Sequence, residues 1–295
     1  MQNVEQEIAR LIQEVDYEEV THLFESLSGG KRLRAKLILK IAPQHPKAPL
    51  LAAIVELIHA ASLLHDDVID EASLRRGVPS VNATEGSKTA VMLGDILYSK
   101  AFTELVSFDK EVARIIASSV TALSKGEMMD VKMAEHFNSD AALYLDMLYL
   151  KTATLIEAAA MAAAHLANKD VTRYGIYGKN LGLSFQIIDD ILDITSDAAT
   201  LGKPAMNDFV EGKCTLPYIY LYDALSEEEK SRLIASHAKE LETQESAWIL
   251  QKMQEYACID KSFELAKQLS DEAMQAVSDD AELVAILQTM IQRSY

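Results

Sequence analysis

The sequence of 295 residues contains few residues that interrupt a helix. It has 11 glycines and 6 prolines, together about 6% of the chain, which is roughly half of ordinary usage. The two cysteines, Cys214 and Cys258, are too few and too far apart for a disulfide framework or a cysteine-based zinc site. The shortage of chain-breaking residues predicts an almost wholly helical protein, and the cysteine content is typical of a reducing cytoplasm.

Basic residues are also in short supply, with 28 Lys and Arg against 45 Asp and Glu and a formal net charge of −17. A general nucleic-acid or anionic-membrane binder would need a basic face, so we expect no nucleic-acid partner. The longest apolar run, residues 49–64, contains Glu56 and His59 and is short for a bilayer span. The first residues lack the basic and apolar regions of a signal peptide. We therefore expect a soluble, cytoplasmic protein without a transmembrane segment.

Apolar residues recur at helical spacing along most of the chain, beginning with Val4, Ile8 and Leu11. No internal repeat or flexible linker interrupts this pattern, so we predict one all-α domain over residues 1–295, a layered helical bundle. The polar stretch 195–213 is expected to form a mobile loop. Helices are expected over residues 50–69, 87–106, 110–133, 141–167 and 171–194, and again between 215 and 295.

Two clusters of three aspartates, each with the spacing DDxxD, stand at the ends of predicted apolar helices. Residues four apart share a helix face, so Asp66 and Asp70 point the same way. Carboxylates gathered beside an apolar surface repel one another and need a cation, and all-oxygen ligands suit Mg²⁺. A single DDxxD is more often a solvated acidic face, but two copies in this setting favour a magnesium site. The clusters are Asp66, Asp67 and Asp70, and Asp189, Asp190 and Asp193.

Short groups of basic residues accompany the acidic clusters. Residues 29–34 read Gly-Gly-Lys-Arg-Leu-Arg, in which the glycines allow an anion to approach the backbone and arginine supplies paired donors to phosphate. By itself this segment is more often an ordinary helix start, and it lacks the spacing of a Walker A loop. Lys151 opens an Ala-rich, buried helix and needs a partner, for which a diphosphate would serve. The other basic candidates are Arg75, Arg76, Lys203 and Lys213.

Several short motifs follow one another in a specific order, and with them the chain resembles the all-trans isoprenyl (polyprenyl) diphosphate synthases. The resemblance extends from Gly29 to about Pro217, and linked motifs are far more specific than one DDxxD. The motifs are GGKRLR at 29–34, ELIHAASLLHDDVID at 56–70, RRGVPSVN at 75–82, GD at 94–95, KT at 151–152, FQIIDDILD at 185–193, LGKP at 201–204 and EGKCTLP at 211–217.

The resemblance implies a helical fold around a deep central cavity, and a homodimer. It implies Mg²⁺-dependent, head-to-tail condensation of isopentenyl diphosphate onto an allylic diphosphate, with release of pyrophosphate. The departing pyrophosphate would accept the proton, and closure of the 195–213 loop would exclude water. A transient membrane contact would serve release of the apolar product.

The resemblance also implies roles for individual residues. Asp66, Asp70 and Asp189 would be the main metal ligands, with Asp67, Asp190 and Asp193 near the metal or acting through water. Arg75, Lys151 and Lys203 would bind the allylic diphosphate; Gly30, Lys31, Arg34, His59 and Arg76 would bind isopentenyl diphosphate; Thr152 and Gln186 would line the reaction centre; and Lys213 would close with the loop. A lone histidine on an apolar helix is usually a core residue, but His59 lies two turns before Asp66 and on the same side.

Residues just before the first acidic cluster limit product length in this family. Ala61 and Ser62 are both small, which predicts a medium-to-long, octaprenyl-like product for a quinone side chain. A farnesyl or geranylgeranyl diphosphate synthase is the nearest alternative.

Other classes of protein remain open. A terpene cyclase would carry a different second metal motif, a catalytically silent partner subunit would not need the full Asp, Arg and Lys set, and a helical scaffold would bind no ligand. The chain departs from the family pattern at Ala35, where Pro is common, at Asp130, where Gln is usual, and at Met206, which replaces a common Gly.

Overall fold

The computed structural model describes residues 1–27, 30–195 and 206–291, and the chain divides into two compact units. Unit 1 consists of Met1–Thr121 and Leu155–Gly175, and unit 2 of Ala122–Thr154 and Ile176–Tyr295. Each unit is described by itself. The predictions of a single domain over 1–295 and of a central cavity remain predictions.

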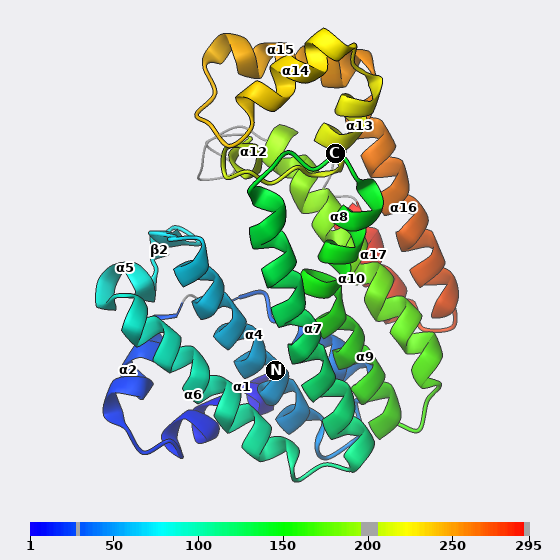
Figure 1. Cartoon of the computed structure of the whole chain (residues 1–295). Coiled ribbons are helices and arrows are strands. Elements are labelled where there is room, and N and C mark those ends of the chain that lie inside the picture. The colour runs from blue at the N-terminus through cyan, green and yellow to red at the C-terminus, as the bar shows by residue number, and fades with distance from the viewer. Residues whose placement is uncertain (28–29, 196–205, 292–295) are drawn as a thin grey trace. The chain divides into compact units, whose positions relative to one another are not determined.

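Helices account for nearly all of the regular structure in the described residues, which confirms the all-α prediction (Figure 1). Helices α7, α9 and α10 have residues in both units. The helices are α1 (Gln2–Gln13), α2 (Glu18–Ser26), α3 (Leu33–Ile41), α4 (Ala48–Ile69), α5 (Val81–Glu85), α6 (Ser87–Leu105), α7 (Lys110–Ala134), α8 (Ala141–Leu148), α9 (Thr154–Leu166), α10 (Val171–Thr195), α12 (Asn207–Val210), α13 (Leu216–Ala224), α14 (Glu227–Ser236), α15 (Thr243–Glu255), α16 (Cys258–Ala276) and α17 (Ala281–Ile291).

Helices α4, α6, α7 and α10 begin and end close to the predicted boundaries, but the predicted helix 141–167 has a different geometry. A π-helical segment, η1 (Tyr149–Ala153), separates α8 from α9. Next to it, a Cβ atom on Gly126 would lie only 2.3 Å from the backbone nitrogen of Lys151. The two backbones are therefore in direct contact here, and a π turn of this kind is common at functional sites.

A two-stranded hairpin follows α4, and the sequence pattern did not predict it. Strand β1 (Leu74–Arg75) pairs antiparallel with β2 (Val78–Pro79). Its turn residues Arg76 and Gly77 have φ angles of 54° and 79°, as a two-residue hairpin turn requires. The short loop sets the direction of the arginine pair after the first acidic cluster.

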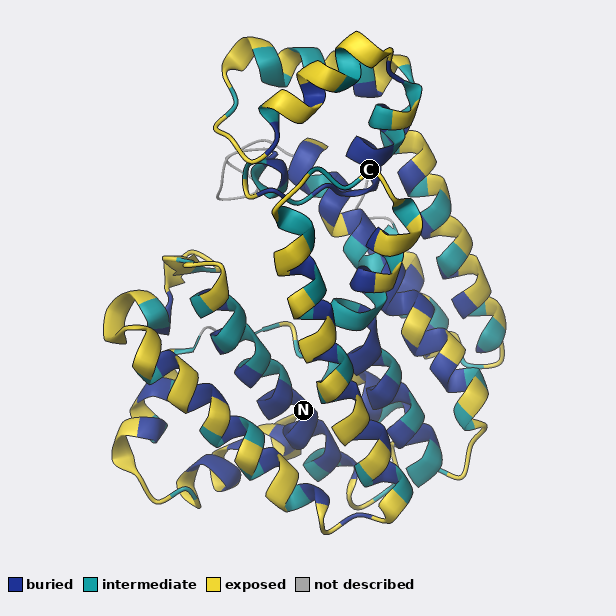
Figure 2. Ribbon diagram, in the orientation of Figure 1, coloured by how far each residue is buried: buried dark blue, intermediate teal, exposed yellow. Residues whose placement is uncertain are grey.

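Helix α4 is the central element of unit 1 and packs against α1, α3 and α6. Every residue from 51 to 58 is buried, so this part of α4 is covered on all sides. In Figure 2 it is dark blue, whereas α16 of unit 2 carries only one buried stripe. A helix enclosed in this way needs few polar positions, which explains the long apolar run in the sequence.

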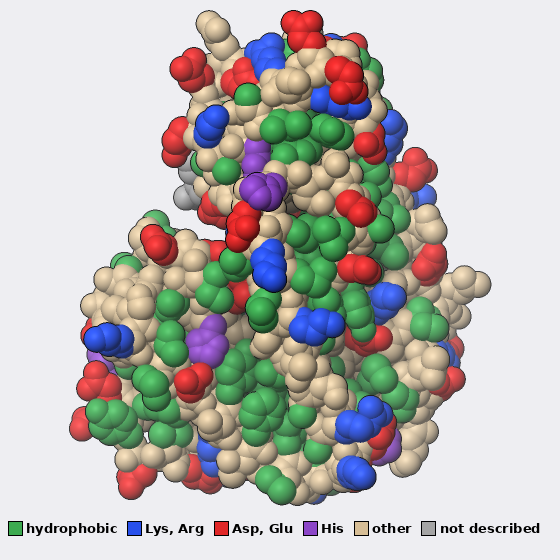
Figure 3. Space-filling model, viewed as in Figure 1, with side chains coloured by type: hydrophobic (Ala, Val, Ile, Leu, Met, Phe, Trp, Pro, Cys, Tyr) green, Lys and Arg blue, Asp and Glu red, His purple; other side chains and the backbone are tan. Residues whose placement is uncertain are grey.

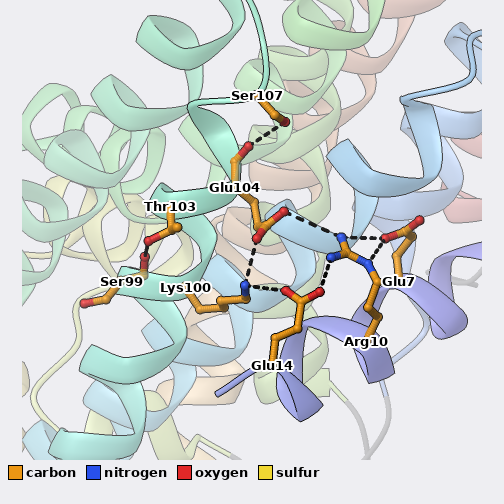
Figure 4. A network of polar contacts seen from close by, with 8 residues as sticks. All are labelled: Glu7, Arg10, Glu14, Ser99, Lys100, Thr103, Glu104 and Ser107. Carbon is orange, nitrogen blue, oxygen red and sulfur yellow. Dashed lines mark hydrogen bonds and ion pairs between the residues drawn. The ribbon is translucent and has the colours of Figure 1, made fainter. Parts of the chain in front are cut away.

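Acidic side chains are scattered over the face of the molecule in Figure 3 rather than gathered in one patch. Some of them form ion pairs that connect α1 to α6 within unit 1 (Figure 4). Arg10 donates to Glu14 at 2.6 Å, and the Lys100 ammonium lies 2.7 Å from both Glu14 and Glu104. An exposed pair such as Arg10–Glu14 contributes about 0.2–1 kcal/mol, less than burial of one leucine side chain, about 1.5–3 kcal/mol.

Unit 2 is built around α13, which packs against α8, α15 and α16, while α17 packs on α16. Its core includes Met206, Phe209 and Tyr218. The prediction of a mobile loop over 195–213 is therefore partly wrong, because Met206 and Phe209 of α12 belong to a packed core. Residues 196–205, including Gly202, Lys203 and Pro204, lie outside the described residues.

Two helical segments are long and apolar enough to cross a membrane by length and composition, namely Ala48–Ile69 and Ala141–Leu166. A transmembrane segment was not expected because the apolar run 49–64 is short. Helix α4, however, has 22 residues and is long enough to cross a membrane, so the shortness of the run is not a valid reason. In the most apolar window of each segment, 61% and 67% of the residues are buried in the protein. Core helices of soluble proteins have these properties too, so the absence of a span stays a prediction.

Candidate functional site

The last turn of α4 carries the first acidic cluster, and burial separates its members. Asp67 is buried, Asp66 is half-buried and Asp70 is exposed. The Arg75 guanidinium donates to Asp67 Oδ1 through Nε at 2.7 Å and also through Nη2. Asp67 therefore connects the β1–β2 hairpin to α4, while the carboxylates of Asp66 and Asp70 remain accessible to a ligand.

Basic side chains gather in unit 1 around the start of α3. Arg34 Nε is buried and has no hydrogen-bond partner among the described residues. Burial lowers the pKa of the Arg34 guanidinium to about 10, with Arg76 lowering it further and Glu56 opposing this. A Cβ atom on Gly30 would lie 2.9 Å from Arg76 Nη1, so the Arg76 guanidinium lies directly against this glycine. At neutral pH Arg34 stays charged and has an unused donor, which suits an anionic ligand.

His59 lies on α4 near these arginines. Burial lowers its pKa well below the ordinary value, and the arginines, Arg34 first, lower it further. His59 is therefore neutral at pH 7 and can donate only one hydrogen bond. The buried carboxylate of Glu56 already accepts from Arg32 at 3.2 Å and from the Ala35 amide at 3.1 Å. Glu56 is thus already occupied by Arg32 and the Ala35 amide, while Arg34 Nε keeps a donor for an anionic ligand such as a diphosphate.

The two residues predicted to limit product length differ in exposure. Ala61 is fully buried, whereas Ser62 is half-buried. The Ser62 hydroxyl donates to the His59 carbonyl at 2.9 Å. Between them, Ser62 is the position at which a larger side chain meets less resistance from the core.

The second acidic cluster, at the end of α10 in unit 2, shows the same separation. Asp189 is exposed, whereas Asp190 and Asp193 are 5% and 3% exposed. Asp190 accepts from Gln186 Nε2 at 3.0 Å and from the Tyr144 hydroxyl. Burial, and then Asp208, raise the pKa of Asp190 to about 8.

Lys151, in the π-helical segment η1, has partners that differ from the prediction. Its ammonium lies 2.5 Å from Asp130 and 2.9 Å from Glu127, both on α7. Burial would lower the pKa of Lys151, but these two carboxylates raise it above its ordinary value. The diphosphate suggested as its partner is therefore not needed to compensate the buried charge, and any diphosphate would bind an already paired ammonium.

A cavity of about 130 Å³ in unit 2 brings several predicted residues together. The predicted residues that line it are Lys151, Thr152, Gln186, Asp190 and Lys213. Thr152 Oγ1 donates to Gln186 Oε1 at 3.4 Å, and the Lys213 ammonium lies 2.8 Å from Glu211.

Sequence reasoning missed two functional candidates in this cavity, Tyr144 and Asp208. Tyr144 stands seven residues, two helical turns, before Lys151, and this spacing could have pointed to it. Asp208 follows Asp190 by more than a dozen residues, so no helical spacing in the sequence indicated that it lies in the same cavity.

No group of three or more His, Cys, Asp or Glu side chains is arranged to hold a metal by itself in the part of the chain that the structure describes. Mg²⁺ takes one or two protein carboxylates and completes its shell with water and substrate phosphate oxygens. The accessible carboxylates of Asp66 and Asp70 in unit 1 are donors of this kind, and so is that of Asp189 in unit 2.

Comparisons with known proteins place the chain among enzymes of isoprenoid chemistry. The polyprenyl synthetase family model matches residues 17–254. The crystal structure of octaprenyl pyrophosphate synthase from Helicobacter pylori is 41% identical, with a TM-score of 0.93 over 98% of this chain and 97% of that one. A polyprenyl synthase from Caulobacter crescentus, complexed with calcium and isoprenyl diphosphate, is 31% identical, with a TM-score of 0.88 over 99% and 94% of the two chains.

One curated relative is named as a short-chain enzyme, so the relatives differ in the length of their products. The short chain isoprenyl diphosphate synthase of Methanothermobacter thermautotrophicus is 36% identical over 220 residues, 70% of this chain and 68% of that protein. The match to the family model covers most of the chain and agrees with these identities and with the all-α fold. The chain belongs to the polyprenyl synthetase family and is a trans-prenyltransferase that makes prenyl diphosphates.

Proposed function

We propose that this enzyme condenses isopentenyl diphosphate head-to-tail with an allylic diphosphate, in a Mg²⁺-dependent reaction, to a medium or long all-trans polyprenyl diphosphate. The product would be octaprenyl-like and would serve as a quinone side chain. The observation that carries the proposal is the separation within both acidic clusters. The aspartates expected to be the main metal ligands are accessible, whereas those expected near the metal or acting through water are buried and hydrogen-bonded to the protein.

Asp66 and Asp70 in unit 1, and Asp189 in unit 2, would each provide carboxylate ligands to divalent metal ions. When bound, Mg²⁺ would neutralise the charge that develops on the departing pyrophosphate. The Caulobacter relative is complexed with a divalent ion and isoprenyl diphosphate together, which supports an ion of this charge here. Asp67, Asp190 and Asp193 would position the helix ends that carry the ligands.

The basic residues would bind the two substrates. In unit 1 the buried, unused donor of Arg34 and the neutral ring of His59 suit the diphosphate of isopentenyl diphosphate. Gly30, Lys31 and Arg76 would join them, with Arg75 acting on the allylic diphosphate. In unit 2 the ammonium of Lys151 has three donors, so one would remain for a diphosphate oxygen beside its two carboxylate partners. Lys213, which lines the unit 2 cavity, would also bind a substrate diphosphate, and Lys203, outside the described residues, would assist.

The proposed product length is supported by the small residues before Asp66 and by the similarity to the Helicobacter octaprenyl enzyme. Purified enzyme incubated with Mg²⁺, farnesyl diphosphate and labelled isopentenyl diphosphate should give products longer than geranylgeranyl diphosphate on chromatography. Products that stop at geranylgeranyl diphosphate or shorter would replace this proposal with the short-chain alternative, which the Methanothermobacter relative favours. Failure of the purified chain to form any product would favour a silent partner subunit.

A bulkier residue at position 62 should shorten the product. Ser62→Phe introduces an aromatic ring one turn before Asp66, at a half-buried position. Overpacking a filled core, as at fully buried Ala61, costs about 1–3 kcal/mol, and the steric cost at position 62 should be lower. Chromatography should show a shift to shorter chains at similar stability. Ser62→Ala, which removes the hydroxyl without adding bulk, should leave the length unchanged. An unchanged product from Ser62→Phe would contradict the assignment of this position.

Assembly and location complete the proposal. We propose a cytoplasmic homodimer that contacts membranes transiently during product release. Helix α6 has accessible apolar side chains at Val91, Met92 and Phe102, which supports a protein–protein contact on that helix. Light scattering should give the mass of two chains, and a single-chain mass at micromolar concentration would contradict the dimer.

A further inference from the structure

The segment 206–215 of unit 2 is hydrogen-bonded at its start to Asp193 of the second acidic cluster. Met206 has a φ of 62°, a left-handed conformation that favours glycine, so the sequence departure at this position coincides with real backbone strain. The Met206 amide donates to the Asp193 carbonyl at 2.8 Å, and the Asp208 amide donates to Asp193 Oδ2 at 3.1 Å. The first end of the segment is thus bound to α10.

His237, after α14, holds the other end. Its Nε2 lies 2.8 Å from the Gly212 carbonyl oxygen, and because a carbonyl only accepts, Nε2 must carry the proton. The residue is 9% exposed, and its ring makes edge-to-face contacts with Phe137 and Phe209 at centroid distances of 5.5 and 5.6 Å. The aromatic contacts fix the direction in which His237 donates.

The peptide group between Gly212 and Lys213 is bonded at both of its ends. Its carbonyl accepts from His237, and its N–H donates to the Asp208 carbonyl at 2.7 Å. Gly212 has a φ of 89°, and a Cβ atom there would lie 2.8 Å from the Ala134 carbonyl oxygen at the end of α7. Since a peptide group is planar, fixing both ends also fixes the direction in which the chain leaves toward the Lys213 side chain.

We propose that His237 is a positioning residue that orients Lys213 in the unit 2 cavity through the Gly212–Lys213 peptide. The inference rests on the proposed function, in which Lys213 binds a substrate diphosphate. Lys213 lines the cavity with Lys151 and Asp190, whereas His237 does not. Removing the His237 donor leaves the buried Gly212 carbonyl without its partner, and the peptide can then rotate and move the ammonium away from the cavity.

Kinetics of three variants test this. His237→Phe keeps an aromatic ring but loses the donor, and should raise the KM for farnesyl diphosphate about tenfold, the size of one such hydrogen bond. His237→Gln places an amide N–H near the position of Nε2 and should restore the KM. Ser236→Ala removes a neighbouring hydroxyl that bonds to Glu245 at 2.9 Å and should leave the KM unchanged. An unchanged KM in a folded His237→Phe protein would overturn the proposal.

A double-mutant cycle separates this role from a general contribution to folding. Lys213→Ala should raise the KM, and adding His237→Phe should raise it no further. Multiplying effects would overturn the inference. An unchanged KM in Lys213→Ala would instead contradict the role of Lys213 in the proposed function, and the positioning role would then fall with it. Fluorescence of Trp248, the single tryptophan, reports folding; if His237→Phe does not fold, His237→Met, flexible and without a donor, replaces it in the cycle.

Discussion

His59 shows at the scale of one residue how the basic group of unit 1 affects stability. Its pKa in the folded protein lies well below 6.5 because of burial and the nearby arginines. Below about pH 6.5 the unfolded chain therefore binds a proton at His59 that the folded chain does not bind. The free energy of unfolding thus keeps this contribution above about pH 6.5 and falls as the pH drops toward the pKa of the folded state. Denaturant unfolding between pH 7 and pH 5 should show a smaller loss for His59→Gln than for the wild type. His22→Gln, an exposed position on α2, is the control, and equal losses in all three proteins would contradict the assigned environment.

Single residues also mark what the sequence could predict. The six aspartates and the arginine pair were visible as motifs, because DDxxD spacing on a helix defines a face. Their separation into accessible and buried carboxylates was not visible, because the partners of Asp67 and Asp190 are Arg75 and Tyr144. Those pairings depend on how the hairpin and α8 pack, and no local pattern encodes them.

The contact between α7 and η1 is the clearest test at the scale of elements. Gly126→Ala would place a methyl group 2.3 Å from the Lys151 backbone nitrogen, so the helix must move and carry Lys151 with it. We expect a loss of about 1–3 kcal/mol in unfolding free energy together with a lower kcat. Gly175→Ala on α10 is the matched control, since its methyl group would meet only side chains, the flexible Met161 at 3.2 Å and Glu157 at 3.8 Å. Equal behaviour of the two variants would contradict the close contact.

Among the elements, periodicity predicted the long helices well. The apolar spacing of α4, α6, α7 and α10 persists over many turns, which gives a strong signal. The hairpin around Gly77 has two residues per strand and leaves almost no pattern. The π turn at Tyr149–Ala153 changes the period by a single residue, and the Ala-rich sequence around it hides the change.

For the whole molecule, the net charge of −17 describes the surface more than the chemistry. Acidic side chains are dispersed in Figure 3, and several form surface ion pairs such as those in Figure 4. The charge excluded a polyanion-binding protein, but only the local spacing of aspartates and arginines indicated a site for a small anion. The family match agrees with that interpretation over most of the chain.

Thermal unfolding with Mg²⁺ and inorganic pyrophosphate tests the central claim most directly, namely that the accessible aspartates bind a metal–diphosphate complex. Wild-type protein should be stabilised only when both are present, by about 2.7 kcal/mol at one hundred times the dissociation constant. Asp66→Asn and Asp189→Asn should lose this stabilisation, whereas Glu71→Gln, which removes an exposed charge next to the first cluster, should keep it. Full stabilisation of the Asp66→Asn and Asp189→Asn proteins would contradict the account.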